Sequence, residues 1–176
     1  KFKKNVGAVT VGDIVEIIEK QIPVALQEEW DNSGLLIGFE EKEVHTILAC
    51  LEIDDKVVAE AKDKNADMII THHPLIFSGI KALNDGDYKG GIIMDLIASG
   101  ISVYSCHTPF DKLKGGNNDI VMGLLGLGSV KNLCGQDVVS AAKMIDRKEE
   151  ADIGRTGELA EPMTFKDVIN LVAEKL

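Results

Sequence analysis

The chain has 176 residues, of which 45% are hydrophobic and 27% charged, and its formal net charge is −10 at pH 7. This composition is that of an ordinary globular domain, and no apolar run approaches the roughly 20 residues that a membrane-spanning helix needs. The acidic balance argues against direct binding to nucleic acid or anionic membranes, because both are negatively charged. Cys50, Cys106 and Cys134 are widely spaced, which argues against a disulfide framework or zinc–thiolate site and favours the reducing cytoplasm.

The first element is predicted by a helix-start signal. The segment from Thr10 to Asp13 has the pattern of a capping box, with Asp in place of Glu. Apolar residues at helical spacing follow it as far as Pro23, where the helix is expected to end. The turn-rich segment 27–34 then carries the only tryptophan, Trp30. It is either a packed loop anchored by Trp30 or a loop that lines a site, and it leads into a short strand at 35–38.

Residues 46–71 have the pattern of a parallel strand–helix–strand unit. Segment 46–53 is apolar nearly throughout, as a strand covered on both faces should be. Asp54 is expected to cap a helix that runs to about residue 64, and the next strand is expected at 66–71. This length suits a right-handed crossover connection.

The remaining elements alternate in the same way. We expect a glycine-rich loop at 77–90, followed by a helix at 91–99 and a strand at 101–106. A helix is expected at 115–125, a strand at 137–145, a loop at 146–150 and a last helix at 164–176. Together these elements predict an α/β fold in a single α/β region over residues 1–176.

Three of the four histidines and one aspartate follow the ends of two predicted strands. His72 and His73 come directly after strand 66–71, and His107 and Asp111 come after strand 101–106. In an open α/β sheet, ligands bind beyond the carboxyl ends of the strands. Imidazole and carboxylate groups are ligands for zinc, iron, manganese or nickel. The sequence therefore predicts a metal site at His72, His73 and Asp111.

The adjacent histidine pair predicts two ions rather than one. Neighbouring residues of a strand point to opposite faces, so His72 and His73 are expected to diverge, and Pro74 should keep His73 extended. Two diverging imidazoles suit two divalent ions about 3.5–4 Å apart, bridged by a carboxylate such as Asp111.

The other candidate residues have less defined roles. His107 could be a metal ligand, an acid/base group or a supporting residue. Pro109 is expected to prevent a regular helix, so the spacing from His107 to Asp111 does not by itself place both on one face. His45 is expected at the surface, and Cys106 in the core.

The chain carries four further motifs, namely EWDNSGL at 29–35, THHP at 71–74, HTPFD at 107–111, and GRTGEL at 154–159 with EPM at 161–163. In this order they resemble the YbgI/Nif-three-like family, whose members are also known as GTP cyclohydrolase I type 2 homologues or dinuclear metal centre proteins. The resemblance implies a layered α/β sheet with helices on both faces, two divalent metal ions and a ring-shaped hexamer. The family's histidine pair matches His72 and His73, and its aspartate ligand matches Asp111.

The chain also departs from the family pattern. Pro109 stands where the family commonly has asparagine. The family's remaining ligands, a histidine and a glutamate, lie in a C-terminal region, and no histidine follows His107 in this chain. Because the last predicted helix also has no C-cap, we expect that the chain lacks its C-terminal part and is the N-terminal part of a Nif-three-like protein.

These patterns lead to one functional hypothesis and one alternative. The first is a cytoplasmic, hexameric, dinuclear metal protein that acts as a metal-dependent hydrolase on a small molecule, with His107 as the candidate catalytic residue. The alternative is a non-catalytic metal- or nucleotide-binding module with a regulatory or interaction role. In both, no contact with nucleic acid or membrane is expected.

Overall fold

The structure is a computed structural model that describes residues 7–140 and 152–176. The chain divides into two compact units, Lys1–His107 and Thr108–Leu176, each of which is described by itself.

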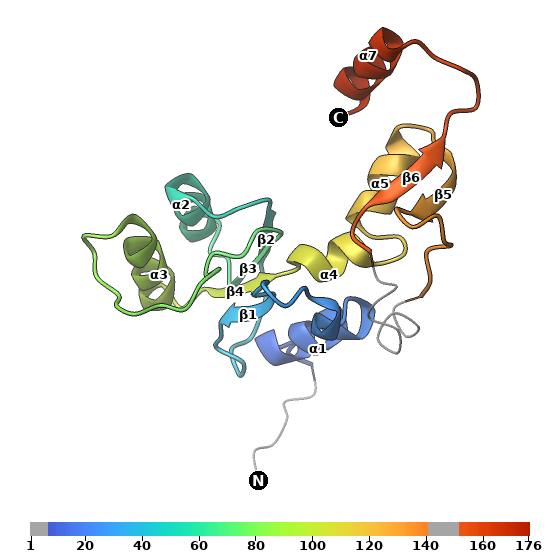
Figure 1. The fold of residues 1–176 in the computed structure, drawn as a ribbon. Coiled ribbons are helices and arrows are strands. Elements are labelled where there is room, and N and C mark those ends of the chain that lie inside the picture. The colour runs from blue at the N-terminus through green and yellow to red at the C-terminus, as the bar shows by residue number, and fades with distance from the viewer. Residues whose placement is uncertain (1–6, 141–151) are drawn as a thin grey trace. The chain divides into compact units, whose positions relative to one another are not determined.

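A four-stranded sheet forms the centre of the first unit (Figure 1). Its strand order is β1 (Gly34–Ile37), β4 (Ser102–Ser105), β3 (Met68–Thr71) and β2 (Ile47–Cys50). The pairs β2–β3 and β3–β4 are parallel, whereas β1 and β4 are antiparallel. The predicted α/β class is therefore confirmed.

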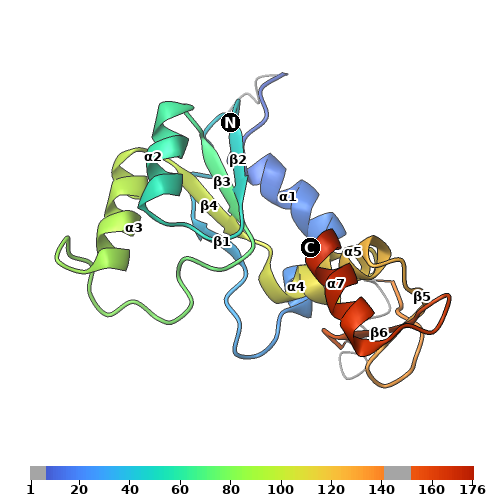
Figure 2. The same ribbon diagram turned by 90° about the horizontal axis from the view of Figure 1, so that it is seen from above.

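Helices cover both faces of this sheet (Figure 2). Helices α2 (Asp55–Asp63) and α3 (Tyr88–Ala98) lie on one face, and α1 (Val11–Gln21) lies on the other, followed by the short 3-10 helix η1 (Val24–Leu26). The expected arrangement of helices on both faces is confirmed.

Alternate residues of the central strands supply two separate cores. Ile69 and Val103 pack with the apolar residues of α2 and α3, whereas Met68 and Tyr104 pack with Val11 of α1. All five side chains are fully or almost fully buried. This alternation is what the pleat of a strand covered on both faces requires.

Side-chain caps begin helices α1, α2 and α3. Thr10 accepts a hydrogen bond from the backbone N–H of Asp13, whose carboxylate accepts from the backbone N–H of Thr10, so the predicted capping box is confirmed. Asp54 caps α2 as predicted. Helix α3 begins at Tyr88, three residues before the predicted start, because Asp87 caps it by accepting from a backbone N–H at 2.7 Å.

Strand β2 corrects one expectation. Segment 46–53 was expected to be covered on both faces, but Ile47 is 41% exposed and Leu51 is 61% exposed. Within β2, it is the alternate residues Leu48 and Cys50 that pack against the core beside α2 and α3. The physical reason is position, since β2 is an edge strand of this sheet and continuous hydrophobicity alone does not distinguish edge from centre.

The second unit is smaller and contains an antiparallel strand pair. Helices α4 (His107–Lys112) and α5 (Asn117–Leu124) are followed by β5 (Gly128–Asn132), which pairs with β6 (Arg155–Glu158), and α7 (Phe165–Lys175) comes last. The helices predicted at 115–125 and 164–176 are confirmed. Neither strand was predicted, because both are largely polar and exposed and lack an alternating apolar pattern.

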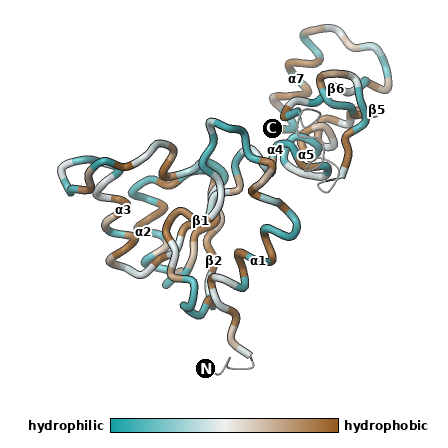
Figure 3. The backbone as a smooth tube through the Cα atoms, turned by 60° about the horizontal axis from the view of Figure 1, so that its bottom comes forward, coloured by the Kyte–Doolittle hydropathy of each residue, from teal (hydrophilic) through white to brown (hydrophobic). Residues whose placement is uncertain are grey.

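Hydropathy follows the same division between packed and exposed faces. Hydrophobic and hydrophilic residues alternate along α1 and α7, as expected for amphipathic helices (Figure 3). Most of the strand expected at 137–145, and the loop expected at 146–150, lie outside the described residues. Across the described residues, every helix is too short or too polar to cross a membrane.

Candidate metal centre

Three histidines gather at the carboxyl ends of β3 and β4. The ring centroids lie 5.2 Å apart for His72 and His73, 5.4 Å for His72 and His107, and 5.9 Å for His73 and His107. The parallel register explains this cluster, because Thr71 lies opposite Ser105 and both strands end there. The backbone N–H of His107 also donates to the carbonyl of His72 at 3.1 Å.

The rings of His72 and His73 do not diverge, contrary to the expectation from strand alternation. Strand β3 ends at Thr71, and the two histidines lie in the bend that follows it. Alternation applies only to the extended residues of a strand. The two rings therefore lie on the same side, with a tilt of 50° between their planes.

Buried hydroxyl groups hold the backbone of this pair. The hydroxyl of Thr71 donates to the carbonyls of Leu51 and His73 at 3.0 and 3.1 Å, and Ser105 donates to the carbonyl of His72 at 2.9 Å. Thr71 and Ser105 are almost completely buried. The main chain below the rings is therefore held by hydrogen bonds from two almost completely buried hydroxyl groups.

A buried carboxylate orients the third histidine. Asp31, whose side chain is 0% exposed, lies 2.7 Å from Nδ1 of His107. Its oxygens also accept from the backbone N–H of Asn32 at 2.6 Å and from the hydroxyl of Ser33 at 2.7 Å. Because an ionised carboxylate can only accept, Nδ1 is the donor in this pair, and in a neutral imidazole Nε2 then holds the lone pair. This is the arrangement by which carboxylates orient histidines that bind metals or transfer protons.

Sequence reasoning missed Asp31 because 76 residues separate it from His107. The antiparallel register of β1 and β4 brings them together, since Gly34 lies opposite Ser105. The available signal was the turn-rich 27–34 segment, for which a site-lining loop was one of two readings.

That segment does line the site. Trp30 is 57% exposed, so it is not a buried anchor, and its ring centroid lies 6.1 Å from that of His107. Phe77 lies 6.4 Å from His107 and 6.2 Å from Trp30. Phe77 and His107, but not Trp30, also line a cleft of about 270 Å³, whose other lining residues are Glu52, Ile53, His73, Pro74, Leu75 and Lys89.

Asp111 belongs to the second unit, on α4. Its carboxylate accepts a hydrogen bond from the side-chain amide of Asn117 at 3.1 Å. Pro109 does not prevent the helix, contrary to expectation, because it sits in the first turn, where a backbone N–H has no partner within the helix. His107 and Asp111 are therefore four residues apart on one helix.

The imidazole groups of His72, His73 and His107 are chemically suitable ligands for a transition metal, since imidazole nitrogen binds each of the predicted metals. Where the structure describes the chain, however, it shows no group of three or more His, Cys, Asp or Glu side chains arranged as a ready metal-binding site. The three imidazoles thus supply suitable donors that an ion would have to draw together.

The remaining candidates are His45 and Cys106. His45 is on the surface as predicted, with its side chain 77% exposed. Cys106 is half-buried and packs against the core beside α1, and burial raises the pKa of its thiol to about 11.

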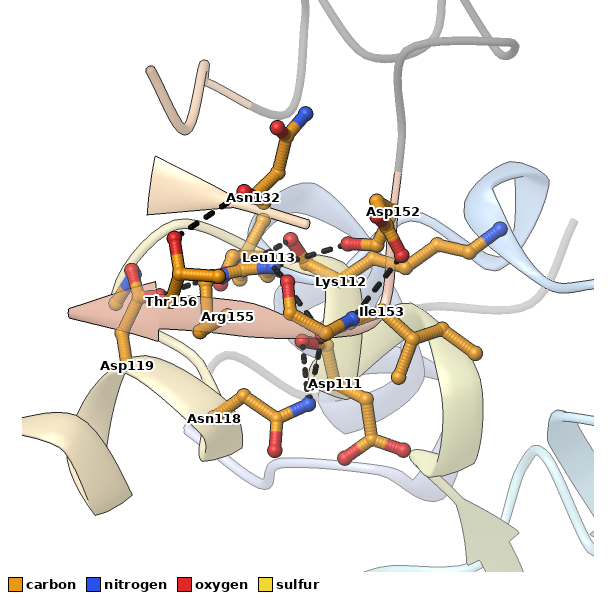
Figure 4. A network of polar contacts seen from close by, with 12 residues as sticks. Asp111, Lys112, Leu113, Asn118, Asp119, Asn132, Asp152, Ile153, Arg155 and Thr156 are labelled. Carbon is orange, nitrogen blue, oxygen red and sulfur yellow. Dashed lines mark hydrogen bonds and ion pairs between the residues drawn. The ribbon is translucent and has the colours of Figure 1, made fainter. Parts of the chain in front are cut away.

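The 154–158 part of the fourth motif has a structural role in the second unit (Figure 4). The side chain of Arg155 is 1% exposed, and its Nε pairs with Asp119. The other guanidinium nitrogens donate to backbone carbonyls, namely those of Lys112, Leu113, Asp152, Ile153 and Gly154. Arg155 therefore connects the end of α4, helix α5 and the start of β6.

Comparisons with known proteins identify relatives of this chain. It is 37% identical over 166 residues to a GTP cyclohydrolase 1 type 2 homolog of Clostridium perfringens, an alignment that covers 94% of this chain and 60% of the relative. It is 49% identical over 102 residues to the GTP cyclohydrolase 1 type 2 of Helicobacter pylori, covering 58% of this chain and 41% of the relative. The crystal structure of a hypothetical protein of Staphylococcus aureus is similar, with a TM-score of 0.80 and 26% identity over 96% of this chain and 64% of that one.

The chain thus spans 60% or less of these two curated relatives. A family model described as Duf34/NIF3 (NGG1p interacting factor 3) matches residues 9–176. The chain therefore belongs to the Duf34/NIF3 family, which confirms the resemblance to Nif-three-like proteins.

Proposed function

We propose that this protein is a metal-dependent hydrolase whose two divalent ions are held by His72, His73 and Asp111. The observation that carries the proposal is the gathering of three imidazoles at the ends of β3 and β4, one of them fixed by the buried carboxylate of Asp31. Zinc, iron, manganese and nickel all suit these donors.

The position of Asp111 on α4 supports its role as the carboxylate ligand. Residues four apart in a helix share a face, so the helical backbone from His107 to Asp111 favours a common direction for the two side chains. Divalent ions, when bound, would lower the pKa of a coordinated water towards about 7 and polarise an electrophile.

His107 is the proton-transfer group in this proposal. Asp31 holds the ring so that Nδ1 donates to the carboxylate, and Nε2 is left to accept a proton from the attacking water and return it to the leaving group. The side chain of His107 is 17% exposed and lines the 270 Å³ cleft, so a small substrate can reach it. Asp31 acts through His107 and is a positioning residue.

The names of the two curated relatives make GTP the first substrate to test. We extend the proposal to a homo-hexamer in the cytoplasm, where the free cysteines Cys50, Cys106 and Cys134 would stay reduced.

Metal analysis tests the site. Wild type, His72→Ala and Asp111→Ala are purified alike, and bound metal is measured by inductively coupled plasma mass spectrometry. Both variants should lose metal with little change in unfolding midpoint, because both residues lie beyond the strand ends and outside the apolar cores. His45→Ala is the matched control, since it removes an exposed histidine. Equal metal content in all four proteins would refute the assignment.

A hydrolysis screen separates the enzyme from a non-catalytic metal- or nucleotide-binding module. Metal-loaded wild type is incubated with GTP and with other nucleotides, and products are followed by chromatography. For a hydrolase, His107→Ala should lower turnover by roughly 10²–10⁴, the usual contribution of a general acid or base, and Asp31→Asn should lower it by less, because it removes only the carboxylate that orients the ring. Metal-loaded protein with no turnover on any substrate would favour the binding module.

A further inference from the structure

We propose that Trp30 and Phe77 form an aromatic wall that binds a planar heteroaromatic ring of the substrate next to His107. This inference rests on the proposed function, since it places the ring beside the proposed proton-transfer group. The two aromatic residues come from separate segments, the loop before β1 and the loop after β3, and converge on the same imidazole.

Their exposure is the first supporting observation. Trp30 is 57% exposed and Phe77 is 45% exposed, although aromatic rings gain most when they are buried. Two half-exposed aromatic rings in contact with a histidine cluster thus offer apolar surface that a ligand can cover. Stacking on such surfaces is a general way to hold planar rings without base-specific hydrogen bonds.

The separation of the rings determines how a ligand ring can bind. Their centroids are 6.2 Å apart and their planes are tilted by 47°. A ring inserted between two others needs about 7 Å, twice the contact distance of roughly 3.5 Å. A ligand ring therefore lies against the exposed surface of one aromatic residue and touches the edge of the other.

The neighbouring cleft supports the same class of ligand. Its volume of about 270 Å³ is near the lower end of small-molecule pockets, about 300–1,000 Å³, so it suits a compact ring system rather than a polymer. Glu52 and Lys89 add one carboxylate and one ammonium to its lining. Ring N–H groups can donate to the first, and an anionic substituent can approach the second.

Trp30 provides the assay, because it is the only tryptophan of the chain. Guanosine is titrated into metal-free and metal-loaded protein, with excitation at the long-wavelength edge of indole absorption. Emission should be quenched to saturation in both forms, since stacking needs no metal. Uridine and 5,6-dihydrouridine form a matched pair that differs by the C5–C6 double bond, and therefore in conjugation and ring planarity, and only uridine should quench.

Substitutions test whether Trp30 and Phe77 form the surface that binds the ring. Phe77→Ala should weaken binding roughly fivefold or more, the usual effect of losing one stacking partner. Phe165→Ala is the matched control, because it removes a phenylalanine that is 82% exposed in the second unit, and its affinity should equal that of wild type. In calorimetry, Trp30→Phe should retain binding and Trp30→Ala should lose it.

Two results would overturn the inference. Protein that retains metal but shows no saturable quenching with guanosine or uridine has no ring site, and the metal proposal would still stand. An emission spectrum that shifts on dilution without ligand means that the aromatic pair contacts a second copy of the chain instead. Conversely, saturable quenching in a protein that fails every hydrolysis test would support the ring site and contradict only the proposed hydrolase.

Discussion

Replacing Arg155 with alanine should open the second unit while leaving the first unit folded. The guanidinium is almost completely buried, and all of its described hydrogen bonds fall within residues 112–154. Its removal leaves Asp119 without its cationic partner, and leaves five backbone carbonyls without one of their donors.

The expected loss of stability in Arg155→Ala follows from the ion pair between Arg155 and Asp119. Removing one partner of a buried pair costs roughly 3–5 kcal/mol, because the other charge stays buried and uncompensated. Asp119 is 19% exposed, and its second oxygen still accepts from the backbone N–H of Gly115 at 2.7 Å. The lower end of the range therefore applies, about 3 kcal/mol, which increases the open population of this unit about a hundredfold.

Hydrogen exchange followed by mass spectrometry measures this effect unit by unit. Peptides from α5, β5 and β6 should exchange about a hundredfold faster in Arg155→Ala. Peptides from β3 and β4 should keep wild-type protection. Arg155→Lys should fall between the two, because lysine keeps the charge but lacks the planar fork that reaches several carbonyls at once. Lys166→Ala, an exposed cation of α7, is the control.

Unchanged protection of α5 and β6 in Arg155→Ala would refute this reasoning. The 154–158 motif would then have to serve another purpose, and a contact with ligand or partner would become the better explanation for a buried arginine there. Equal loss of protection in β3 and β4 would refute the unit-specific part of the prediction.

Three further predictions concern the remaining charged, thiol and assembly features. Asp67→Asn should destabilise the first unit by roughly 1–3 kcal/mol near neutral pH, because Asp67 pairs with Lys42 at 2.9 Å and accepts from two backbone N–H groups before β2. Burial raises the pKa of Asp67, but these donors outweigh it and the net pKa is lowered. The stabilisation is thus present above the unfolded pKa of about 4 and lost as pH falls through the folded value, and urea unfolding of both proteins across this range should show the difference vanish. Cys134, which is exposed, should be alkylated faster than Cys106 at mildly alkaline pH, because burial raises the pKa of Cys106 to about 11 and only the thiolate reacts; peptide mass spectrometry gives both rates. Light scattering of the full-length protein should show a homo-oligomer, expected to be a hexamer, and a clean monomer at micromolar concentration would contradict it.

The starts of α1, α2 and α7 could be predicted from the sequence because a cap depends on only four neighbouring residues, whereas the cap of α3 by Asp87 was missed. Thr10, Asp54 and Thr164 each accept from the backbone N–H three positions later, as the sequence indicates. The central strands β3 and β4 were predicted for a similar reason, since each is a short apolar run followed by histidine. Such signals are local, and the structure of neighbouring segments does not change them.

Features that depend on distant partners could not be predicted in this way. The exposure of β2 depends on its edge position, and the pairing of β5 with β6 joins segments whose own sequences do not favour strands. The direction of the His72 and His73 rings depends on where β3 ends, because a strand one or two residues longer would have made them diverge. Side chains do alternate between the two faces along β3, but His72 and His73, to which this alternation was applied, lie beyond the end of the strand.

Register decides whether Asp31 can reach His107 at all. Gly34 lies opposite Ser105 at one end of the β1–β4 pair, and the irregularity of this pairing falls at the other end, between Leu35 and Ile37. A slip of one residue would move the loop by about 3.3 Å along the strand, more than the 2.7 Å contact between Asp31 and His107 can accommodate. Gly34 has a φ of +104°, a backbone conformation that side chains disfavour, so this residue lets the chain turn from the loop into the strand. Gly34, at the end of the 27–34 segment, thus helps to position the carboxylate of Asp31, and Asp31 positions the imidazole of His107.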